Sequence, residues 1–157
     1  MGQSKALLLT PAGIPLAQHQ ANLLRQAGCG EVIVVLGSDY DSIRSRLPEC
    51  RTIFNANWET GRFSSVQAGL RALKSFDGCF ILPVDTAGVV LKTLETTREY
   101  ADKNQPLAVR PTFNGKDGKI AWISQVLAAE WMRAKTADTR LDEILKEKAA
   151  RLPVDDP

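Results

Sequence analysis

Two kinds of apolar pattern alternate along the chain. Continuous apolar runs at 32–36 and 78–84 predict strands that are buried on both faces. In segment 15–27 the apolar residues instead recur at helical spacing, and Gly28 and Gly30 predict the end of that helix. Strands that alternate with helices indicate βαβ units with right-handed crossovers.

Extended along the whole chain, the pattern predicts helices at 15–27, 38–47, 64–73, 88–102, 125–134 and 139–149, and strands at 32–36, 51–55, 78–84, 107–113, 119–124 and 151–154. The strands at 107–113 and 119–124 flank a turn-rich segment and can pair as a hairpin. We therefore expect an α/β fold with a three-layer, mostly parallel Rossmann-like sheet and helices on both faces. Ligands bind beyond the carboxyl ends of such strands, which here are Gly37, Asn55 and Asp85.

The composition is that of an ordinary globular protein, and we expect a single domain over 1–157. The formal net charge is +2 and the basic residues are scattered, so a nucleic-acid partner is not expected. A membrane helix needs roughly 20 apolar residues, and no run approaches that length. The amino-terminal segment is a poor signal peptide, so we expect a cytoplasmic protein. Cys29, Cys50 and Cys79 are odd in number and far apart in the sequence, which argues against a zinc site and against a disulfide framework.

Asp85 is the sharpest candidate for chemistry. It follows an apolar strand directly, which places a carboxylate at the rim of the expected ligand crevice. A hard oxygen ligand at that point suits Mg²⁺, which is typically held by one or two carboxylates with water and phosphate oxygens. The alternative is structural, because Asp85 can also cap the helix expected from Gly88.

A second candidate is the loop at 57–65, where a strand end leads into a helix through glycine and two serines. Free backbone N–H groups and hydroxyls at a helix start can hold a base, a ribose or an anion. The residues that we expect to bind substrate here are Asn57, Gly61, Ser64 and Ser65. Helix capping is the competing explanation, although it accounts for at most one of the two serines.

Six segments taken together resemble the molybdenum-cofactor nucleotidylyltransferases. The most specific is Asn-x-Asn-Trp-Glu-x-Gly-x-x-Ser-Ser-Val-x-Ala-Gly-Leu at 55–70, which is closer to the cytidylyltransferase branch than to the guanylyltransferase branch. The segments are 1–8, 13–19, 32–37, 55–70, 81–85 and 137–145. They occur in order over nearly the whole chain, and the fold that the resemblance implies is of the nucleotide-diphospho-sugar transferase type.

The resemblance implies a nucleotidyltransferase. A phosphorylated acceptor such as molybdopterin would attack the α-phosphate of CTP or another NTP, so that CMP or GMP is transferred and pyrophosphate leaves. Mg²⁺ on Asp85 would neutralise phosphate charge, Lys5 would contact the triphosphate, and the loop 57–65 would hold substrate. The expected partners are the nucleoside triphosphate and the small acceptor, and the sequence carries no signal for an oligomeric state.

The chain also departs from the family pattern and resembles a member truncated at both ends. The glycine-rich loop Leu-Ala-Ala-Gly-x-Ser-x-Arg, which wraps the triphosphate in the family, is missing before Met1. Ala87 replaces a proline, and Gly118-Lys119-Ile120 replaces Gly-His-Pro. The late acidic segment that supplies a second metal ligand would follow 155–157. Together these departures predict weak or no NTP turnover.

Three interpretations follow from the matches and the departures. The chain can be an enzyme, active or descended from an active form. It can be a catalytically inactive relative that serves as a ligand- or protein-binding module. It can also be shortened by a wrongly assigned start, with Met1 inside the family signature, which an in-frame upstream segment would reveal.

The missing first strand of the family raises a structural question, because that strand lies at the centre of the sheet. Unpaired backbone groups buried on both sides of a vacant centre would cost ~1–3 kcal/mol each. We therefore expect Ala6–Thr10 to take the central position, with Gly13 in a shortened phosphate loop 11–13. Lys5 would then lie on the edge away from the crevice and could not reach a triphosphate.

Overall fold

The computed structural model describes residues 4–86, 88–135 and 141–155. The expectations placed on Ala87, on the first residues of segment 137–145 and on the end of the chain from Asp156 lie outside these residues. The same holds for the start of segment 1–8.

Each predicted helix and strand has a counterpart in the structure. The helices are η1 (Lys5–Leu7), α1 (Leu16–Gln26), α2 (Tyr40–Arg44), η2 (Trp58–Thr60), α3 (Arg62–Ala72), α4 (Leu91–Asn104), α5 (Gln125–Arg133) and α6 (Leu141–Lys148). The strands are β1 (Ile33–Leu36), β2 (Arg51–Phe54), β3 (Gly78–Ile81), β4 (Ala108–Phe113), β5 (Lys116–Asp117), β6 (Ala121–Ser124) and β7 (Ala149–Pro153). β3 is shorter than expected because Pro83 has no N–H with which to continue a ladder.

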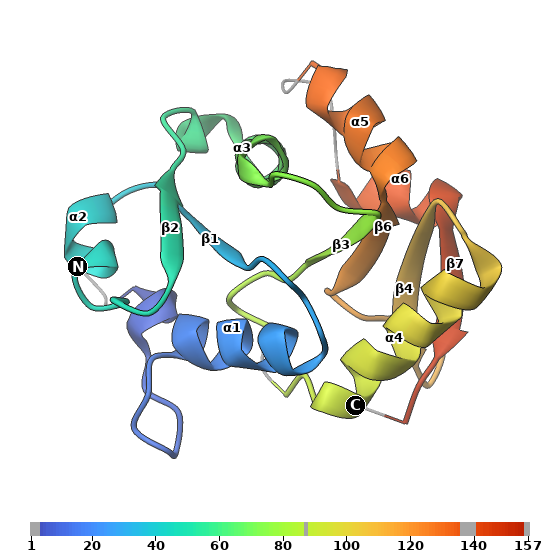
Figure 1. Cartoon of the computed structure of the whole chain (residues 1–157), viewed down its shortest axis with the longest axis horizontal. Helices are drawn as coiled ribbons and strands as arrows, with labels where there is room; N and C mark the ends of the chain where they lie inside the picture. Colours follow the sequence, from blue (N-terminus) through green and yellow to red (C-terminus); the bar gives the residue numbers. More distant parts are fainter. Residues whose placement is uncertain (1–3, 87, 136–140, 156–157) are drawn as a thin grey trace.

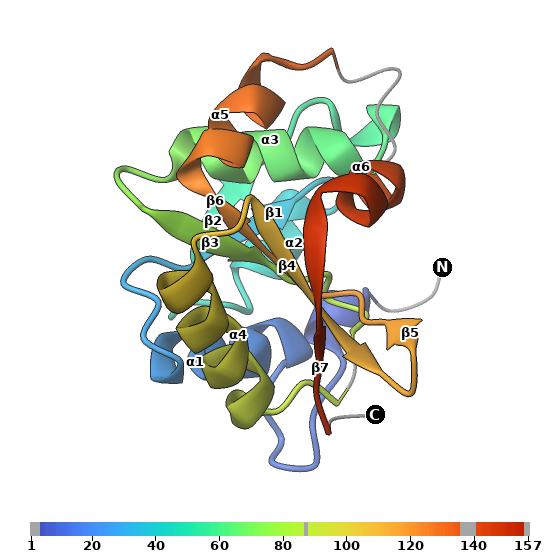
Figure 2. The same cartoon turned by 90° about the vertical axis from the view of Figure 1, so that its right-hand side faces the viewer.

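The strands and helices form three layers. Helices α3, α5 and α6 lie on one face of the strands, and α1 and α4 lie on the other (Figure 2). On the first face Leu70, Ile123 and Trp131 belong to one buried apolar cluster. On the second face Ala27, Leu94 and Ile120 form another. The predicted α/β class with helices on both faces is confirmed.

The sheet is divided into two parts. β1 and β2 form a parallel pair, while β3, β6, β4 and β5 form a separate antiparallel series to which β7 adds in parallel with β4. The predicted hairpin is confirmed, since β4 pairs with β6 in antiparallel fashion. The antiparallel share of the sheet is larger than we expected, because an apolar run indicates burial but carries no information on strand direction.

Segment Ala6–Thr10 pairs with neither β1 nor β3, so the hypothesis of a central strand there is wrong. Its first residues belong to η1, and Leu9 makes an isolated bridge with Pro15. Ala6 and Leu7 are buried in a cluster with residues of β1 and α2. The segment thus gains its burial beside the start of α1, and the centre of the sheet between β1 and β3 receives no strand from the described residues (Figure 1).

A central strand at Ala6–Thr10 would be required only if β1 and β3 were buried on both faces. Only Leu36 among their residues is buried, and the others are half-buried. These strands are therefore not sealed from water, and the argument for a strand between them, which assumed fully buried backbone groups, loses its premise. The divided sheet is tolerated for this reason.

The free backbone groups can be assigned residue by residue. The carbonyl oxygen of Leu36 accepts from Asn55, so in β1 the groups of Leu36 and Val34 face β2 and those of Val35 face the division. On β3 the carbonyl oxygen of Asp77 accepts from Gln125 of α5, next to the ladder with β6. By the same alternation, the backbone groups of Cys79 form hydrogen bonds with β6, whereas those of Phe80 face the division between the two parts of the sheet.

Hydrogen exchange should follow this alternation. We expect the amide of Val35 to exchange faster than that of Val34, and the amide of Phe80 faster than that of Cys79, because only the second of each pair donates within a ladder. Site-resolved exchange measured by NMR tests this, with the two adjacent valines as a matched pair. Equal protection of Val34 and Val35 would mean that another strand pairs with β1 in solution.

Candidate functional site

Asp85 lies in the loop that follows β3, with its side chain 32% exposed. Two ammonium groups approach the same carboxylate oxygen, Oδ2. The Nζ atom of Lys119 is 3.4 Å away and that of Lys5 is 3.8 Å away. Asp85 is thus a surface carboxylate surrounded by cations. It is not the cap of α4, whose N-cap residue is Val90.

The loop that carries Asp85 is held from α1. Gln20 is buried, and its Nε2 atom donates to the carbonyl oxygens of Val84 at 3.2 Å and Thr86 at 2.9 Å. These two bonds flank Asp85 and fix the loop on both sides of it. This role could not be predicted from the sequence, because a glutamine in an amphipathic helix resembles any solvent-facing residue.

The charge of Asp85 is stabilised by its neighbours. Partial burial acts to raise the pKa of this carboxyl, but Lys119, and then Lys5 and Arg62, outweigh it and hold the pKa below the usual range. Asp85 is therefore ionised at neutral pH, and three cations converge on the loop after β3.

Lys5 belongs to this cluster, so the expectation that it lies on the far edge of the sheet is wrong. It sits at the start of η1 and reaches Asp85 because the segment after it folds back beside α1. Gly13 is not brought to the cluster. It lies at positive φ (77°) in the exposed loop 10–14, which projects from the molecule before α1 (Figure 1).

The loop 57–65 is organised by a buried side chain at the end of β2. Asn55 donates from Nδ2 to the hydroxyl oxygens of Ser64 (2.9 Å) and Ser65 (3.1 Å). Its Oδ1 accepts from the backbone N–H of Asn57 at 3.0 Å. One amide therefore ties the strand end, the turn and the first residues of α3 together.

The predicted residues of this loop have different situations. Ser64 is buried and donates to the carbonyl oxygens of Asn57 and Gly61, so its hydroxyl serves the loop itself. Ser65 is half-buried, and its hydroxyl accepts a hydrogen bond from Asn55. Gly61 precedes α3 with a φ of 113°, a conformation that favours glycine. Of the two serines, Ser64 is the one found to donate its hydroxyl proton within the described residues.

A cavity of about 300 Å³ opens beside the Asp85 cluster. Its walls come from the start of α3, the end of β3, β4, the β5–β6 turn and α6. Arg62 and Lys119 belong both to this cavity and to the surroundings of Asp85. Together with Arg110, they are cations that sequence reasoning missed as site residues, because their proximity arises only from the packing of distant elements.

The metal-binding capacity of the site is limited. Within residues 4–86, 88–135 and 141–155, no group of three His, Cys, Asp or Glu side chains could hold a metal ion. Asp85 can supply one oxygen ligand, which suits Mg²⁺ only if phosphate oxygens and water complete its coordination. The residues present therefore fit a metal that arrives with a phosphate ligand.

Within the same ranges, every helix is too short or too polar to span a bilayer.

Comparison with known proteins gives a family match over nearly the whole chain. The family described as MobA-like NTP transferase domain matches residues 1–152. Nicotine blue oxidoreductase of Paenarthrobacter nicotinovorans is 29% identical over 96 residues, which are 60% of this chain and 47% of that protein. The chain thus matches about half the length of this curated relative.

Solved structures share the fold. The manganese complex of Rv0371c from Mycobacterium tuberculosis has a TM-score of 0.79 at 19% identity, covering 98% of this chain and 83% of that chain. Molybdopterin-guanine dinucleotide biosynthesis protein A from Archaeoglobus fulgidus has a TM-score of 0.69 at 19% identity, covering 98% and 76%. CMP:2-keto-3-deoxy-manno-octonic acid synthetase complexed with CTP has a TM-score of 0.74 at 12% identity, covering 96% and 83%. The predicted nucleotide-diphospho-sugar transferase type of fold is confirmed.

The role of Asn55 in the loop can be measured by mutation. We expect Asn55→Ala to lower the free energy of unfolding by about 1–3 kcal/mol, because it removes three hydrogen bonds around a buried position. Asn57→Ala is the matched control, since that side chain is exposed, and it should change stability by less than about 0.5 kcal/mol. Urea denaturation gives both values. Equal effects would show that the amide of Asn55 does not hold the loop.

Proposed function

The chain belongs to the MobA-like NTP transferase family, and on that premise we propose that it binds a nucleoside triphosphate beside Asp85. It transfers the CMP or GMP unit to a phosphorylated acceptor such as molybdopterin. The observation that carries this proposal is the convergence of Lys5, Arg62 and Lys119 on the Asp85 loop. A cluster of three cations favours the binding of a polyanion, such as a triphosphate, next to the loop 57–65.

The chemistry requires positioning and charge neutralisation. An oxygen of the acceptor phosphate attacks the α-phosphorus of the triphosphate and forms the new P–O bond, while the bond to the bridging oxygen breaks and pyrophosphate leaves. Lys5 and Lys119 are placed to neutralise phosphate charge, and the start of α3 offers backbone N–H groups and the hydroxyl of Ser65. Asn57 and Gly61 shape the loop against the nucleotide.

Mg²⁺ is the metal that we propose for this site, held by Asp85. When bound, it would supply Lewis-acid neutralisation of the phosphate oxygens. Asp85 is ionised, partly exposed and held between two backbone anchors, which supports this role. When the metal occupies Asp85, Lys5 and Lys119 would leave this carboxylate and pair with phosphate oxygens instead.

The inactive relative, a ligand-binding module without turnover, remains a second candidate for one reason. In the described part of the chain, the loop 10–14 projects from the molecule before α1 (Figure 1), and none of the residues found to interact with the Asp85 side chain belongs to it. A triphosphate held beside Asp85 would be less enclosed than catalysis favours. Both candidates use the same binding site, and release of pyrophosphate from CTP or GTP in the presence of acceptor separates them. We further propose that the protein acts in the cytoplasm.

Calorimetric titration with CTP and with GTP, with and without Mg²⁺, tests the site. We expect Lys119→Met and Lys5→Met each to weaken binding by about 10-fold, the effect of one lost charge-assisted contact. Lys92→Met on the exposed start of α4 is the matched control and should bind as the unmodified protein does.

Asp85→Asn tests the metal separately. Without metal this variant should bind the nucleotide as well as or better than the unmodified protein, because a negative charge next to the phosphates is removed. Addition of Mg²⁺ should strengthen binding only in the unmodified protein. If Mg²⁺ strengthened both equally, the metal would have its ligands elsewhere.

A further inference from the structure

The cavity beside the Asp85 cluster contains a buried charge. The side chain of Arg110 on β4 is only 9% exposed and lines the cavity, and a guanidinium stays ionised at any physiological pH. Removing such a charge from water costs several kcal/mol unless it is compensated. The compensation that Arg110 receives therefore indicates what the cavity accepts.

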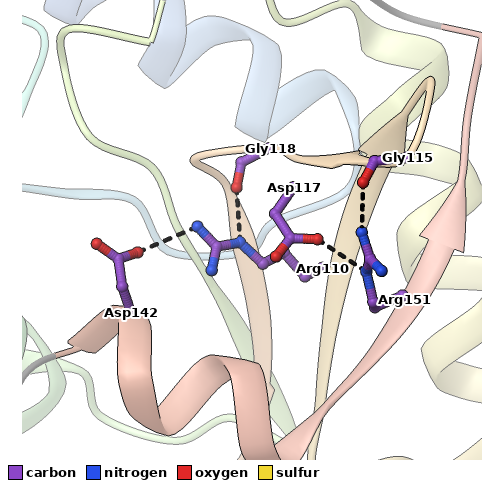
Figure 3. A network of polar contacts seen from close by, with 6 residues as sticks. All are labelled: Arg110, Gly115, Asp117, Gly118, Asp142 and Arg151. Carbon is purple, nitrogen blue, oxygen red and sulfur yellow. Dashed lines mark hydrogen bonds and ion pairs between the residues drawn. The ribbon is translucent and has the colours of Figure 1, made fainter.

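Two hydrogen bonds fix the guanidinium and leave part of it free. Nε donates to the carbonyl oxygen of Gly118 at 2.7 Å, and Nη2 pairs with Oδ1 of Asp142 at 3.1 Å (Figure 3). Within the described residues, no hydrogen bond is found for the third nitrogen, Nη1. The side chain of Asp142 is 61% exposed, so it neutralises Arg110 from the solvent side and can move away.

The other carboxylate of the cavity wall is already engaged. Asp117 accepts from Nε of Arg151 on β7 at 2.8 Å, and Nη2 of the same arginine donates to the carbonyl oxygen of Gly115 (Figure 3). These contacts tie β5 to β7 and hold the turn whose Gly118 carbonyl orients Arg110. Asp117 is therefore paired with a cation from outside the cavity wall, and within the described residues no hydrogen bond joins it to Arg110.

The wall of the resulting cavity carries a net positive charge, and its uncharged part is largely apolar. Its charged wall residues are Arg62, Arg110, Lys119 and Lys146 against Asp117 and Asp142, and the rest of the wall includes Ile81 and Leu145. About 300 Å³ lies at the lower end of the range for small-ligand pockets. The shape and charge suit one phosphate group on a compact, partly apolar body.

We propose that this cavity is the subsite for the phosphate of the acceptor, with Arg110 as its buried anchor and Lys146 at its mouth. The inference rests on the proposed function, because the cavity shares Arg62 and Lys119 with the surroundings of Asp85. A phosphomonoester bound on Arg110 is thereby placed next to the triphosphate that it attacks. Arg110 selects acceptors that carry a phosphate over their dephosphorylated forms.

Phenyl phosphate is a suitable probe, with phenol as its uncharged control, in an NMR titration. We expect phenyl phosphate to bind and phenol not to bind. Lys146→Met should weaken binding several-fold, whereas Lys116→Met, an exposed lysine on β5 outside the cavity wall, should not. Arg110→Gln should weaken it by about 10-fold or more.

A second variant covers the case in which Arg110→Gln fails to fold. The side chain of Asp142 is exposed, so Asp142→Asn should not disturb folding. The variant removes the carboxylate that pairs with the Arg110 guanidinium and should tighten phenyl phosphate binding several-fold. Unchanged affinity in Asp142→Asn, or no binding of phenyl phosphate at millimolar concentration, would overturn the proposal.

The same titrations separate this inference from the proposed function. CTP should retain its affinity in Asp142→Asn and Arg110→Gln. If CTP binds while phenyl phosphate does not, the subsite is refuted and the nucleotide site stands. If phenyl phosphate binds in the expected variant order while CTP does not, the anion subsite stands and the nucleotide proposal is refuted. If CTP displaces phenyl phosphate and Arg110→Gln weakens both, the cavity belongs to the nucleotide and the acceptor assignment is wrong.

Discussion

Packing of α3 across the divided sheet is the interaction on which the rest of the structure depends. Gly69 of α3 lies so close to β1 that an added Cβ would be 3.1 Å from Cγ2 of Val35. On the other part of the molecule, Phe63 meets Trp131 edge-on at 5.6 Å, and Gln67 donates to the Trp131 carbonyl at 2.8 Å. The helix thereby joins the β1–β2 pair to the larger sheet, although no ladder connects them among the described residues.

The candidate site follows from the position of this helix. Its first residue, Arg62, reaches both the Asp85 loop and the cavity of Arg110, and its first turn carries the serines that Asn55 holds. A triphosphate beside Asp85 and a phosphomonoester on Arg110 would meet at this point. Each site presents fixed positive charge that the phosphates of its ligand would compensate. Electrostatic attraction therefore favours binding of both ligands, and the reaction then requires mainly their alignment.

The sequence predicted the order of elements and the position of Asp85 after a strand, because both depend on local patterns. It failed where proximity depends on packing, as for Lys119 and Arg110, which are ordinary polar positions within strands and turns until β4, β6 and α6 assemble. The error at Ala6–Thr10 had a different cause. An apolar run predicts burial on both faces, whereas the residues of β1 and β3 other than Leu36 are half-buried. Ala6 and Leu7 instead pack in an apolar cluster that includes Ala17 of α1.

The most direct test of the nucleotide site is an NMR titration of the assigned protein with CTP and Mg²⁺. The account predicts that amide shifts change first at Lys5, in the loop 57–65 and around Asp85, while those of Arg44 and Thr52, which line a separate pocket, stay constant. Shifts confined to that separate pocket, or none at saturating nucleotide, would contradict it.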